Sequence, residues 1–559
     1  MATDSTLVFP SPILERWRKW DSGAHQRANA HWGNVARTDP TFSRVFMTVE
    51  LVFGDGVVVQ VARAPITTTS SIDGSVHEYQ QGLVDEPDLD HTLDLGSTSA
   101  SARSLSFAVP ADVLDPSAVL LRGGILAGVG EVSLQRDGDD YELRFVLLRG
   151  DMTGGVVLGA TGELVQVSIS DPTETQSLLV PATSVDTDRW PLAQADVLGL
   201  RYPLVINGYP SVPCQRVLDD HGVTGLQWLV CAPGRDLQIG TVYVNGDVAA
   251  GGYLPATETD TTDALGAAVK IVDSTTSAGP WEESDTMYAE LTRKAATPAR
   301  SVVGVVQRLL EGYTALGRLG LNPDLFSEAE VAMPGYPPQV LVNSSGSAAV
   351  DVMDFVQSTL LSSFPMVFLT YMGRGLGPVV VDRRERPGGG GIAGQLYGGQ
   401  WPLLERLVLV NETDKGSLFN AFELRYSYSA MDNSYAKVVK RDATNSVACR
   451  LSEAAVGGRR TMGTVDSPFI MTDELANYVI DWLVAHLALP SYYVEWSCCA
   501  SLITRYRLGQ NVLYTDDRIT AFSGALATIT RLTYSRSKPV IGFNVWHPKW
   551  KQLLLGATA

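Results

Sequence analysis

The sequence predicts a mainly β protein with α+β modules, divided into several domains. At 559 residues the chain is too long for a single hydrophobic core. Its 52 glycines and 29 prolines favour many short turns, and most of its apolar segments alternate with the period of two of half-buried strands. Hydrophobic and charged contents of 45% and 19% are typical of a folded chain. We expect small β-barrels or sandwiches together with helix-on-sheet domains.

The stretch 141–208 organises this interpretation. Apolar residues alternate in 143–147 and again in 164–169, and glycine-containing turns at 154–155 and 161–162 interrupt them, which predicts antiparallel strands. The remainder is an extended connector that ends in an Asn207-Gly208 turn. The stretch contains no nucleophile motif, metal-ligand cluster or phosphate loop, so it is typical of a scaffold.

Before this stretch we expect an N-terminal arm and a series of hairpins. The arm covers residues 1–40 and includes the basic-aromatic patch 17–20, which we interpret as part of an amphipathic turn that packs on the body. Strands are predicted at the following segments: 46–53 and 57–61 around a Gly-Asp-Gly turn, 104–109, 131–134, and 141–148 after an Asp137-Gly138 turn.

An acidic run at 85–94 raises the question of calcium. A calcium loop needs oxygen ligands at alternate positions around a central glycine. Pro87 and the intervening apolar residues break that pattern. We therefore predict a solvated acidic face there.

After residue 208 the pattern changes from hairpins to mixed elements. Strands at 228–231 and 241–244 are predicted, the second followed by an Asn245-Gly246 turn. Residues 255–285 are rich in Thr, Asp and Ser, which favours a surface loop or a domain boundary. The predicted elements that follow are helices at 302–313 and 348–361, strands at 366–371 and 379–382, and a glycine linker at 388–391.

The last third combines one strand, one helix and a compact β-module. Residues 419–428 are predicted as a strand, and a helix is expected to begin near Thr472-Asp473 and to end before Pro490. His486 lies among apolar residues of this helix, and we interpret it as a packed core histidine. The β-module comprises 492–497, Leu502, 509–514, 525–534 and 540–545.

These elements suggest five segments. The predicted division is an arm at 1–40, a β-rich domain at 41–208, a β-hairpin domain or insertion at 209–285, a helix-on-sheet α+β domain at 286–415, and a strand-helix-β-barrel module at 416–559.

Charge and cysteine content limit the function. The chain has 61 acidic and 43 basic residues and a net charge of −18, which argues against specific or general nucleic-acid binding. Its five cysteines include no CxxC motif. Cys214 and Cys231 could pair across a hairpin, but free thiols and a reducing compartment are favoured. No signal peptide and no membrane span are expected.

Motifs that carry chemistry are not found in the sequence. It has no HExxH, GxxxxGK[ST] or GxSxG motif, and its seven histidines do not pair at metal-ligand spacing. We therefore assign no catalytic, cofactor-binding or metal-binding residue and expect no enzyme. A glycosidase needs only two carboxylates, so among 61 acidic residues that class of activity stays open.

Four features, taken in order, resemble the tail hub proteins of long-tailed bacteriophages and gene transfer agents. They are the β-rich opening with 79–87 before 104–107, the segment from Arg149-Gly150 to Pro203, the helix followed by strands 366–371 and 379–382, and the final series of strand 420–428, helix 472–489, strand 508–512 and strand 540–545. Each motif alone is ordinary β-sheet sequence, and it is their order over roughly residues 40–550 that carries the resemblance.

The resemblance implies a structural hub of a tail tip or baseplate at the distal end of the virion tail, assembled in the host cytoplasm. Such a protein forms a homotrimeric ring whose related β-barrels make a pseudo-sixfold collar around the DNA channel. It would contact the distal tail ring protein, the C-terminus of the tape-measure protein, and tail fibre or tip proteins. Long members of the family add hydrolytic or carbohydrate-binding domains after the core. This chain ends soon after the core module, so the resemblance assigns those tasks to other subunits.

Two functions of other classes remain as alternatives. One is a virion-associated enzyme that degrades host cell-wall or surface polysaccharide. The other is a carbohydrate-binding receptor adhesin, since the chain has 11 tryptophans that could serve as sugar platforms. Trp190, Trp482 and Trp546 stand in apolar or extended contexts, and we predict that they are core residues.

Overall fold

The structure is a computed structural model, and it confirms a mainly β chain with several sheets and few helices. No helix among the described residues is long and apolar enough to cross a membrane. The described residues are 25–546 with the exception of 40, 54–56, 85, 94–103, 116–127, 159–162, 171–178, 182, 194, 221–224, 233–235, 251–256, 274–281, 283, 314–319, 334, 343–349, 374, 383–391, 398–410, 413–416, 498, 517–518 and 520–521.

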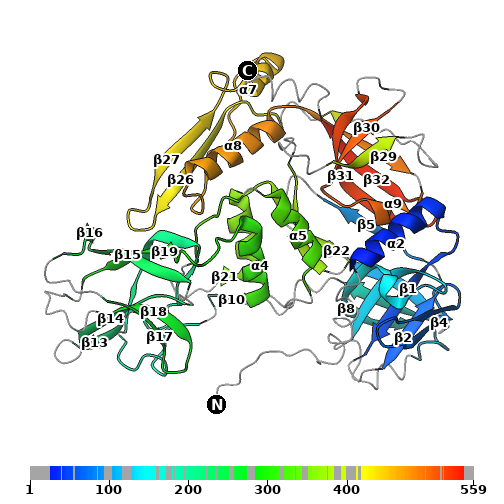
Figure 1. The fold of residues 1–559 in the computed structure, drawn as a ribbon, viewed down its shortest axis with the longest axis horizontal. Coiled ribbons are helices and arrows are strands. Elements are labelled where there is room, and N and C mark those ends of the chain that lie inside the picture. Colours follow the sequence, from blue (N-terminus) through cyan, green and yellow to red (C-terminus); the bar gives the residue numbers. More distant parts are fainter. Residues whose placement is uncertain are drawn as a thin grey trace.

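The N-terminal part of the fold is one eight-stranded sheet with a helix beside it (Figure 1). The strands lie in the order β3-β4-β2-β1-β7-β8-β9-β6. The elements are α2 (His25–Thr38), β1 (Val45–Val52), β2 (Val58–Ala62), β3 (Ile66–Thr69), β4 (Val76–Gln81), β6 (Ser104–Pro110), β7 (Val129–Arg136), the 3-10 turn η2 (Tyr141–Leu143), β8 (Phe145–Leu158) and β9 (Leu164–Ser170).

Two four-stranded sheets make up the middle of the chain, with strand orders β12-β19-β15-β16 and β13-β14-β18-β17. The strands are β12 (Gly208–Pro213), β13 (Gln215–Asp220), β14 (Gly225–Cys231), β15 (Leu237–Val244), β16 (Asp247–Val248), β17 (Thr257–Thr262), β18 (Ala268–Asp273) and β19 (Met287–Arg293). A core that includes Tyr209, Trp228 and Leu291 draws on both sheets.

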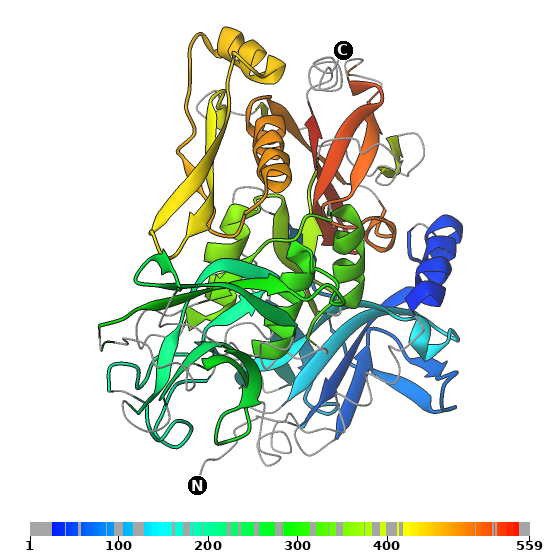
Figure 2. The ribbon, with the colours of Figure 1, turned by 60° about the vertical axis from the view of Figure 1, so that its left-hand side comes forward.

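Helices and short two-stranded sheets form the centre of the molecule (Figure 2). The elements are β10 (Leu179–Val180), β11 (Leu204–Ile206), α4 (Val302–Tyr313), α5 (Pro323–Ala332), β20 (Val340–Val342), β21 (Val350–Asp351), α6 (Val352–Asp354), the π-helix η5 (Phe355–Leu360), the 3-10 turn η6 (Leu361–Ser363), β22 (Val367–Met372) and β23 (Gly375–Val380). Val302, Val305, Val306 and Leu309 of α4 are fully buried here, as their helical spacing requires.

The C-terminal part contains a three-stranded sheet, β27-β26-β28, and a larger sheet in the order β24-β30-β31-β32-β29-β25. The elements are β24 (Ile392–Tyr397), β25 (Asn411–Glu412), β26 (Phe422–Ser429), β27 (Ser434–Arg441), α7 (Val447–Val456), β28 (Val465–Asp466), α8 (Asp473–Leu487), β29 (Ser491–Ser497), α9 (Leu502–Arg505), β30 (Asn511–Thr515), β31 (Ala525–Tyr534) and β32 (Val540–Trp546). Helix α8 begins at its Thr472 cap, whose side chain accepts a hydrogen bond from the Leu475 amide, as predicted.

The first and last parts of the chain are joined by strand β5 (Leu89–Thr92), which pairs antiparallel with β31. In Figure 1 this strand lies beside the C-terminal sheet rather than in the N-terminal one. A single core cluster contains Met47 and Phe107 of the first sheet together with Trp496 and Phe543 of the last. The two large sheets therefore share one hydrophobic core.

Several predicted elements are confirmed. Strands β1, β2, β6 and β31 lie at the predicted segments 46–53, 57–61, 104–109 and 525–534 to within one residue at each end, and helices α4 and α8 lie at 302–313 and 473–487. The strand predicted at 419–428 begins only at Phe422. Asn245 and Gly246 both have positive φ, 53° and 89°, between paired strands β15 and β16, which is the conformation that their sequence predicts. The glycine linker at 388–391 and the patch at 17–20 lie outside the described residues. The five-segment division of the chain stays a prediction.

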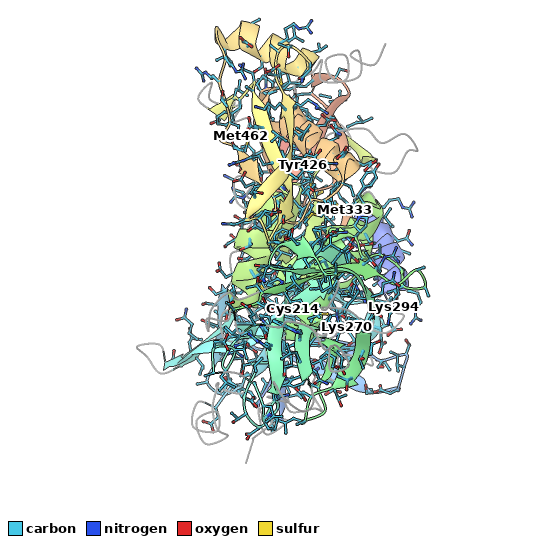
Figure 3. All side chains as sticks on the ribbon, turned by 90° about the vertical axis from the view of Figure 1, so that its left-hand side faces the viewer. Cys214, Lys270, Lys294, Met333, Tyr426 and Met462 are labelled. Carbon is cyan, nitrogen blue, oxygen red and sulfur yellow. The ribbon has the colours of Figure 1, made fainter. Side chains whose placement is uncertain are left out.

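Residues 255–285 correct the prediction of a surface loop. Strands β17 and β18 pair in register from Thr257 opposite Asp273 to Thr262 opposite Ala268. Lys270 has a fully buried side chain that donates to Glu258 and, at 2.7 Å, to Asp260. Figure 3 shows Lys270 with Lys294, which also reaches Asp260. The polar residues that suggest a loop are thus paired across strands.

Smaller corrections concern element type and limits. Tyr141–Leu143 is a 3-10 turn and not part of the strand that follows. Gly154-Gly155 lies inside β8, where the pairing with β9 shifts register, and does not end the strand. The helix predicted from 348 begins at Val352, because 350–351 pair with β10. Leu502 begins helix α9 and is not in a strand.

Candidate functional site

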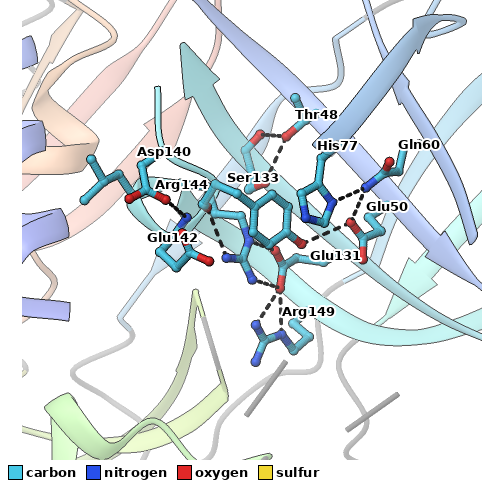
Figure 4. A network of polar contacts seen from close by, with 12 residues as sticks. Thr48, Glu50, Gln60, His77, Glu131, Ser133, Asp140, Glu142, Arg144 and Arg149 are labelled. Atoms are coloured by element: carbon cyan, nitrogen blue, oxygen red, sulfur yellow. Dashed lines mark hydrogen bonds and ion pairs between the residues drawn. The ribbon is translucent and has the colours of Figure 1, made fainter. Parts of the chain in front are cut away.

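A buried network of charged and polar side chains lies in the N-terminal part of the fold (Figure 4). It lies on one face of the N-terminal sheet. Glu50 of β1 stands opposite Glu131 of β7, and Glu131 stands opposite Arg149 of β8. Because paired residues point to the same face of a sheet, the register itself places these three charges together. Thr48 and Ser133, also paired in register, extend the polar face with a 2.9 Å hydrogen bond.

Glu131 is the centre of this network. Arg144 donates its Nε to Glu131 Oε1 at 2.5 Å, and Arg149 donates its Nε to Oε2 at 2.9 Å. The side chains of Glu131 and Arg144 are each only 1% exposed, and that of Arg149 is 8% exposed. A buried carboxylate requires such paired donors, since an isolated buried charge loses several kcal/mol of solvation.

Glu50 is held by neutral donors on the other side. The Tyr141 hydroxyl donates to Glu50 Oε2 at 3.1 Å and Gln60 Nε2 donates to the same atom at 2.7 Å. The His77 ring stacks on Tyr141 at 3.7 Å, and the Arg144 guanidinium lies 4.2 Å from the Tyr141 ring centre. Burial raises the pKa of Tyr141 well above its ordinary value, so its hydroxyl stays a donor.

These contacts hold neighbouring elements together, and we call the network of Glu50, Glu131, Tyr141, Arg144 and Arg149 the lock. The carboxylates are engaged by arginine, tyrosine and glutamine donors, and nearly all of their surface is buried. A general acid or base must instead reach a substrate proton. The network fastens the η2 turn to β1, β7 and β8, and with it the start of β8.

A small cavity lies where the N-terminal sheet, helix α5 and the C-terminal module meet. Its lining includes Arg144, His91, Asp324 and Arg507, and its volume is about 80 Å³. Such a space holds two or three waters, whereas ligand pockets measure roughly 300–1,000 Å³. This junction therefore suits packing of the three regions rather than binding of a substrate.

Ion pairs reinforce the β5–β31 junction. Arg531 donates to Asp90 at 2.7 Å and to Glu495 at 2.8 Å, and Arg536 donates to Glu86 at 2.8 Å. Thr533 donates its hydroxyl to Asp90 at 2.8 Å. The acidic run is thus solvated in part, as expected, since Asp88 and Asp90 are exposed, but Asp90 and Glu86 also pair with the C-terminal module. Asp85 and Asp94 lie outside the described residues.

The role of Asp90 can be tested by reversing its charge. We expect Asp90→Lys to destabilise the junction by about 1–2 kcal/mol, because the substitution replaces a partly exposed ion pair with Arg531 by repulsion between two positive charges. Amide hydrogen exchange across β5 should accelerate while exchange in β12 and β19 stays unchanged. Glu78→Lys, an exposed reversal on β4, is the matched control. If amide hydrogen exchange across β5 is equal in the two variants, Asp90 does not hold β5 against β31.

The other residues weighed from sequence have structural roles. His486 is 9% exposed, stacks on Trp482 at 3.6 Å and meets Trp546 edge-on at 5.2 Å, so it is a packed core histidine. The three tryptophans predicted as core are at most 8% exposed. Cys214 and Cys231 are free thiols. Among the residues that the structure describes, no group of three His, Cys, Asp or Glu could hold a metal ion.

The lock and the junction were not found from sequence. The sequence did contain a signal for the lock. Glu50 and Glu131 each alternate with apolar residues of a predicted strand, and this pattern indicates a charged side chain on a buried face of each strand. The signal for β5 was weaker, because a four-residue acidic strand has no apolar pattern of its own.

Comparison with known proteins gave only structural likenesses. No family model and no curated protein matches the chain. The 43 kDa tail protein of prophage MuSo2 from Shewanella oneidensis aligns over 90% of this chain and 99% of its own, with 7% identity and a TM-score of 0.36. A tail protein from Neisseria meningitidis MC58 aligns over 90% and 97%, with 9% identity and a TM-score of 0.34.

A third solved structure covers less of the chain. Prophage tail protein gp18 from Listeria monocytogenes EGD-e aligns over 61% of this chain and 94% of its own, with 10% identity and a TM-score of 0.25.

Proposed function

We propose that this chain is a structural protein of a bacteriophage tail, and specifically a hub that forms a homotrimeric ring at the distal end of the tail. The ring would join the six-fold tail to three-fold tip components around the DNA channel. In this role the chain is not an enzyme. The proposal places it in the same kind of particle as the tail proteins from Shewanella oneidensis and Neisseria meningitidis named above.

The observation that carries the proposal is the pairing of two large β-modules within one chain. The eight-stranded sheet and the β24–β32 sheet share one core and are joined by β5. Three copies of such a chain present six β-modules, so a three-fold ring can offer a nearly six-fold face. This is the arrangement that the order of motifs in the sequence implies for a hub.

The charge of the chain agrees with a channel wall. A net charge of −18 favours repulsion of the phosphate backbone over general nucleic-acid binding, which relies on basic surface. DNA could then pass without adhering. The partners proposed from the resemblance are further copies of the chain, the distal tail ring protein, the tape-measure C-terminus, and fibre or tip proteins.

Solution mass tests the ring directly. Light scattering on the purified chain across concentration should give a species of three times 60.2 kDa. Electron microscopy of that species should show closed rings with three-fold symmetry and six peripheral lobes. A chain that remains monomeric in the presence of its neighbouring tail proteins, or that clears peptidoglycan in a zymogram, would overturn the proposal.

A further inference from the structure

A polar groove with charged residues in its lining lies between helices α4 and α5. Its volume is about 460 Å³. Its lining contains the two arginines Arg300 and Arg308, the apolar residues Leu321, Pro323 and Phe326, and Gln307 with Glu311. The carboxylate of Glu311 accepts a hydrogen bond from Gln307 Nε2 at 2.9 Å, so the lining holds two arginines against one acidic residue. Both arginines are exposed, whereas Leu321 and Phe326 are each only 4% exposed. A groove of this kind accepts a carboxylate that is followed by an apolar side chain.

The two arginines have no partner in the part of the chain that the structure describes, since neither guanidinium makes a hydrogen bond or ion pair there. Several other cations at the surface are paired. Lys437 and Arg441 of β27, for example, each pair with an aspartate of α8. The chain has an excess of acidic residues, yet this groove contains two arginines without a described partner. The groove therefore favours binding of an anionic partner.

Gly304 keeps the space between the arginines open. Gly304 and Arg308 are four residues apart and lie on the same side of α4, and Arg300 stands two residues before the helix begins. A side chain at Gly304 would meet Arg300 Cβ at 3.4 Å and Arg300 Cγ at 3.9 Å. Glycine inside a helix costs roughly 1 kcal/mol relative to alanine, and the backbone here is regular helix, so room beside the arginines is a physical reason for it.

A complementary surface is formed by a loop that packs on strands β13, β14 and β18. We call it the Leu192 loop, residues 186–193 and 195–200. Leu192 and Leu198 are 55% and 39% exposed. Asp188 and Asp196 are exposed on the same loop, and neither forms an ion pair with a described residue. The loop thus presents acidic residues and leucines together.

The Leu192 loop is rigidly held despite its exposure. Trp190 donates its indole N–H to the Tyr202 hydroxyl at 2.8 Å, and that hydroxyl donates to Asp263 at 2.8 Å. Arg189 also donates to Asp263, at 2.7 Å. Leu192 is therefore displayed from a fixed frame, and a pre-ordered apolar anchor loses little entropy on binding.

We propose that the Leu192 loop of one copy of this chain docks in the α4–α5 groove of the next copy. Asp188 and Asp196 pair with Arg300 and Arg308, and the leucines cover Leu321 and Phe326. The contact joins two different surfaces, which is the heterologous type that a three-fold ring requires. It rests on the proposed ring and names the surfaces that hold it together.

A charge exchange on the full-length chain tests the contact. Arg308→Glu should raise the concentration at which half of the chain is assembled by about 30-fold or more, as expected when a desolvated charge pair at an interface is broken. Asp196→Arg should do the same. The double variant Asp196→Arg/Arg308→Glu restores opposite charges at every contact of a ring, and it should recover most of the lost assembly.

Matched controls separate this contact from general charge or folding effects. Arg63→Glu reverses an exposed arginine in the bend between β2 and β3 and should leave assembly unchanged. Leu192→Ser should weaken assembly by about 10-fold, whereas Val248→Ser, at a side chain 62% exposed on β16, should not. Circular dichroism and the melting temperature must stay unchanged in every variant that is compared.

The outcomes distinguish the contact from the ring. If the unaltered chain forms trimers and Arg308→Glu and Leu192→Ser form them equally well, the proposed contact is wrong and the ring stands. If the single reversals weaken assembly but the double variant recovers nothing, the direct pairing of Asp196 with Arg308 is wrong. If the unaltered chain never assembles, both the ring and the contact are overturned.

Discussion

Glu131→Gln should lower the free energy of unfolding by about 3–5 kcal/mol, the range expected when one member of a buried ion pair is removed. The change leaves Arg144 and Arg149 buried with one neutral acceptor in place of a carboxylate. It also turns one acceptor oxygen into an N–H group that faces guanidinium donors. Urea denaturation followed by circular dichroism measures the loss.

A surface pair provides the control for this variant. Lys440 lies 2.7 Å from Glu423, and their side chains are 61% and 30% exposed. Glu423→Gln should cost no more than about 1 kcal/mol, because solvent screens an exposed pair. If both glutamine variants unfold at the same urea concentration, the N-terminal network does not act as a lock.

Gly509→Ala should destabilise the C-terminal module by about 2–5 kcal/mol. Gly509 has a φ of 77°, which costs other residues roughly 1–2 kcal/mol. A Cβ there would lie 2.0 Å from Val379 Cγ1 of β23, and forcing atoms into a packed core costs a further 1–3 kcal/mol or so. Thermal unfolding with a probe on Trp496 would report the change.

Gly524→Ala separates the two contributions. Gly524 has a similar φ of 67°, but nothing lies within 4 Å of its ideal Cβ position. Its substitution should cost only the backbone share, roughly 1–2 kcal/mol. Equal losses at both glycines would mean that the contact between Val379 and Gly509 does not hold the centre of the molecule against the C-terminal module.

Local structure was predictable from the sequence where it is determined by residues that are close together in the chain. The Asn245-Gly246 turn follows from two residues that tolerate positive φ. Helix α8 follows from the Thr472 cap and from apolar residues on one face. His486 was interpretable for the same reason, since its neighbours along the helix are tryptophan and leucine.

Two strands were not predictable, for different reasons. Strand β17 has the sequence TETDTT, which lacks apolar alternation and so suggests a loop, although it pairs with the next strand along the chain, β18, and with Lys270. Strand β5 has only the four residues LDHT, and its partners Arg531 and β31 are more than 400 residues away. The partner of β5 cannot be inferred from nearby sequence.

The sequence by itself determined the mainly β class, most turns, two long helices and the order of motifs that suggests a tail hub. Apolar alternation and turn-forming residues each involve only a few neighbouring residues, so both can be recognised in the sequence alone. Only the tertiary structure decided which sheets share a core, which charges are buried, and where the α4–α5 groove lies. Those features depend on strand register and on contacts between segments that are remote in the sequence. Glu131 is an example, because only its burial between Arg144 and Arg149 makes this glutamate the centre of the network.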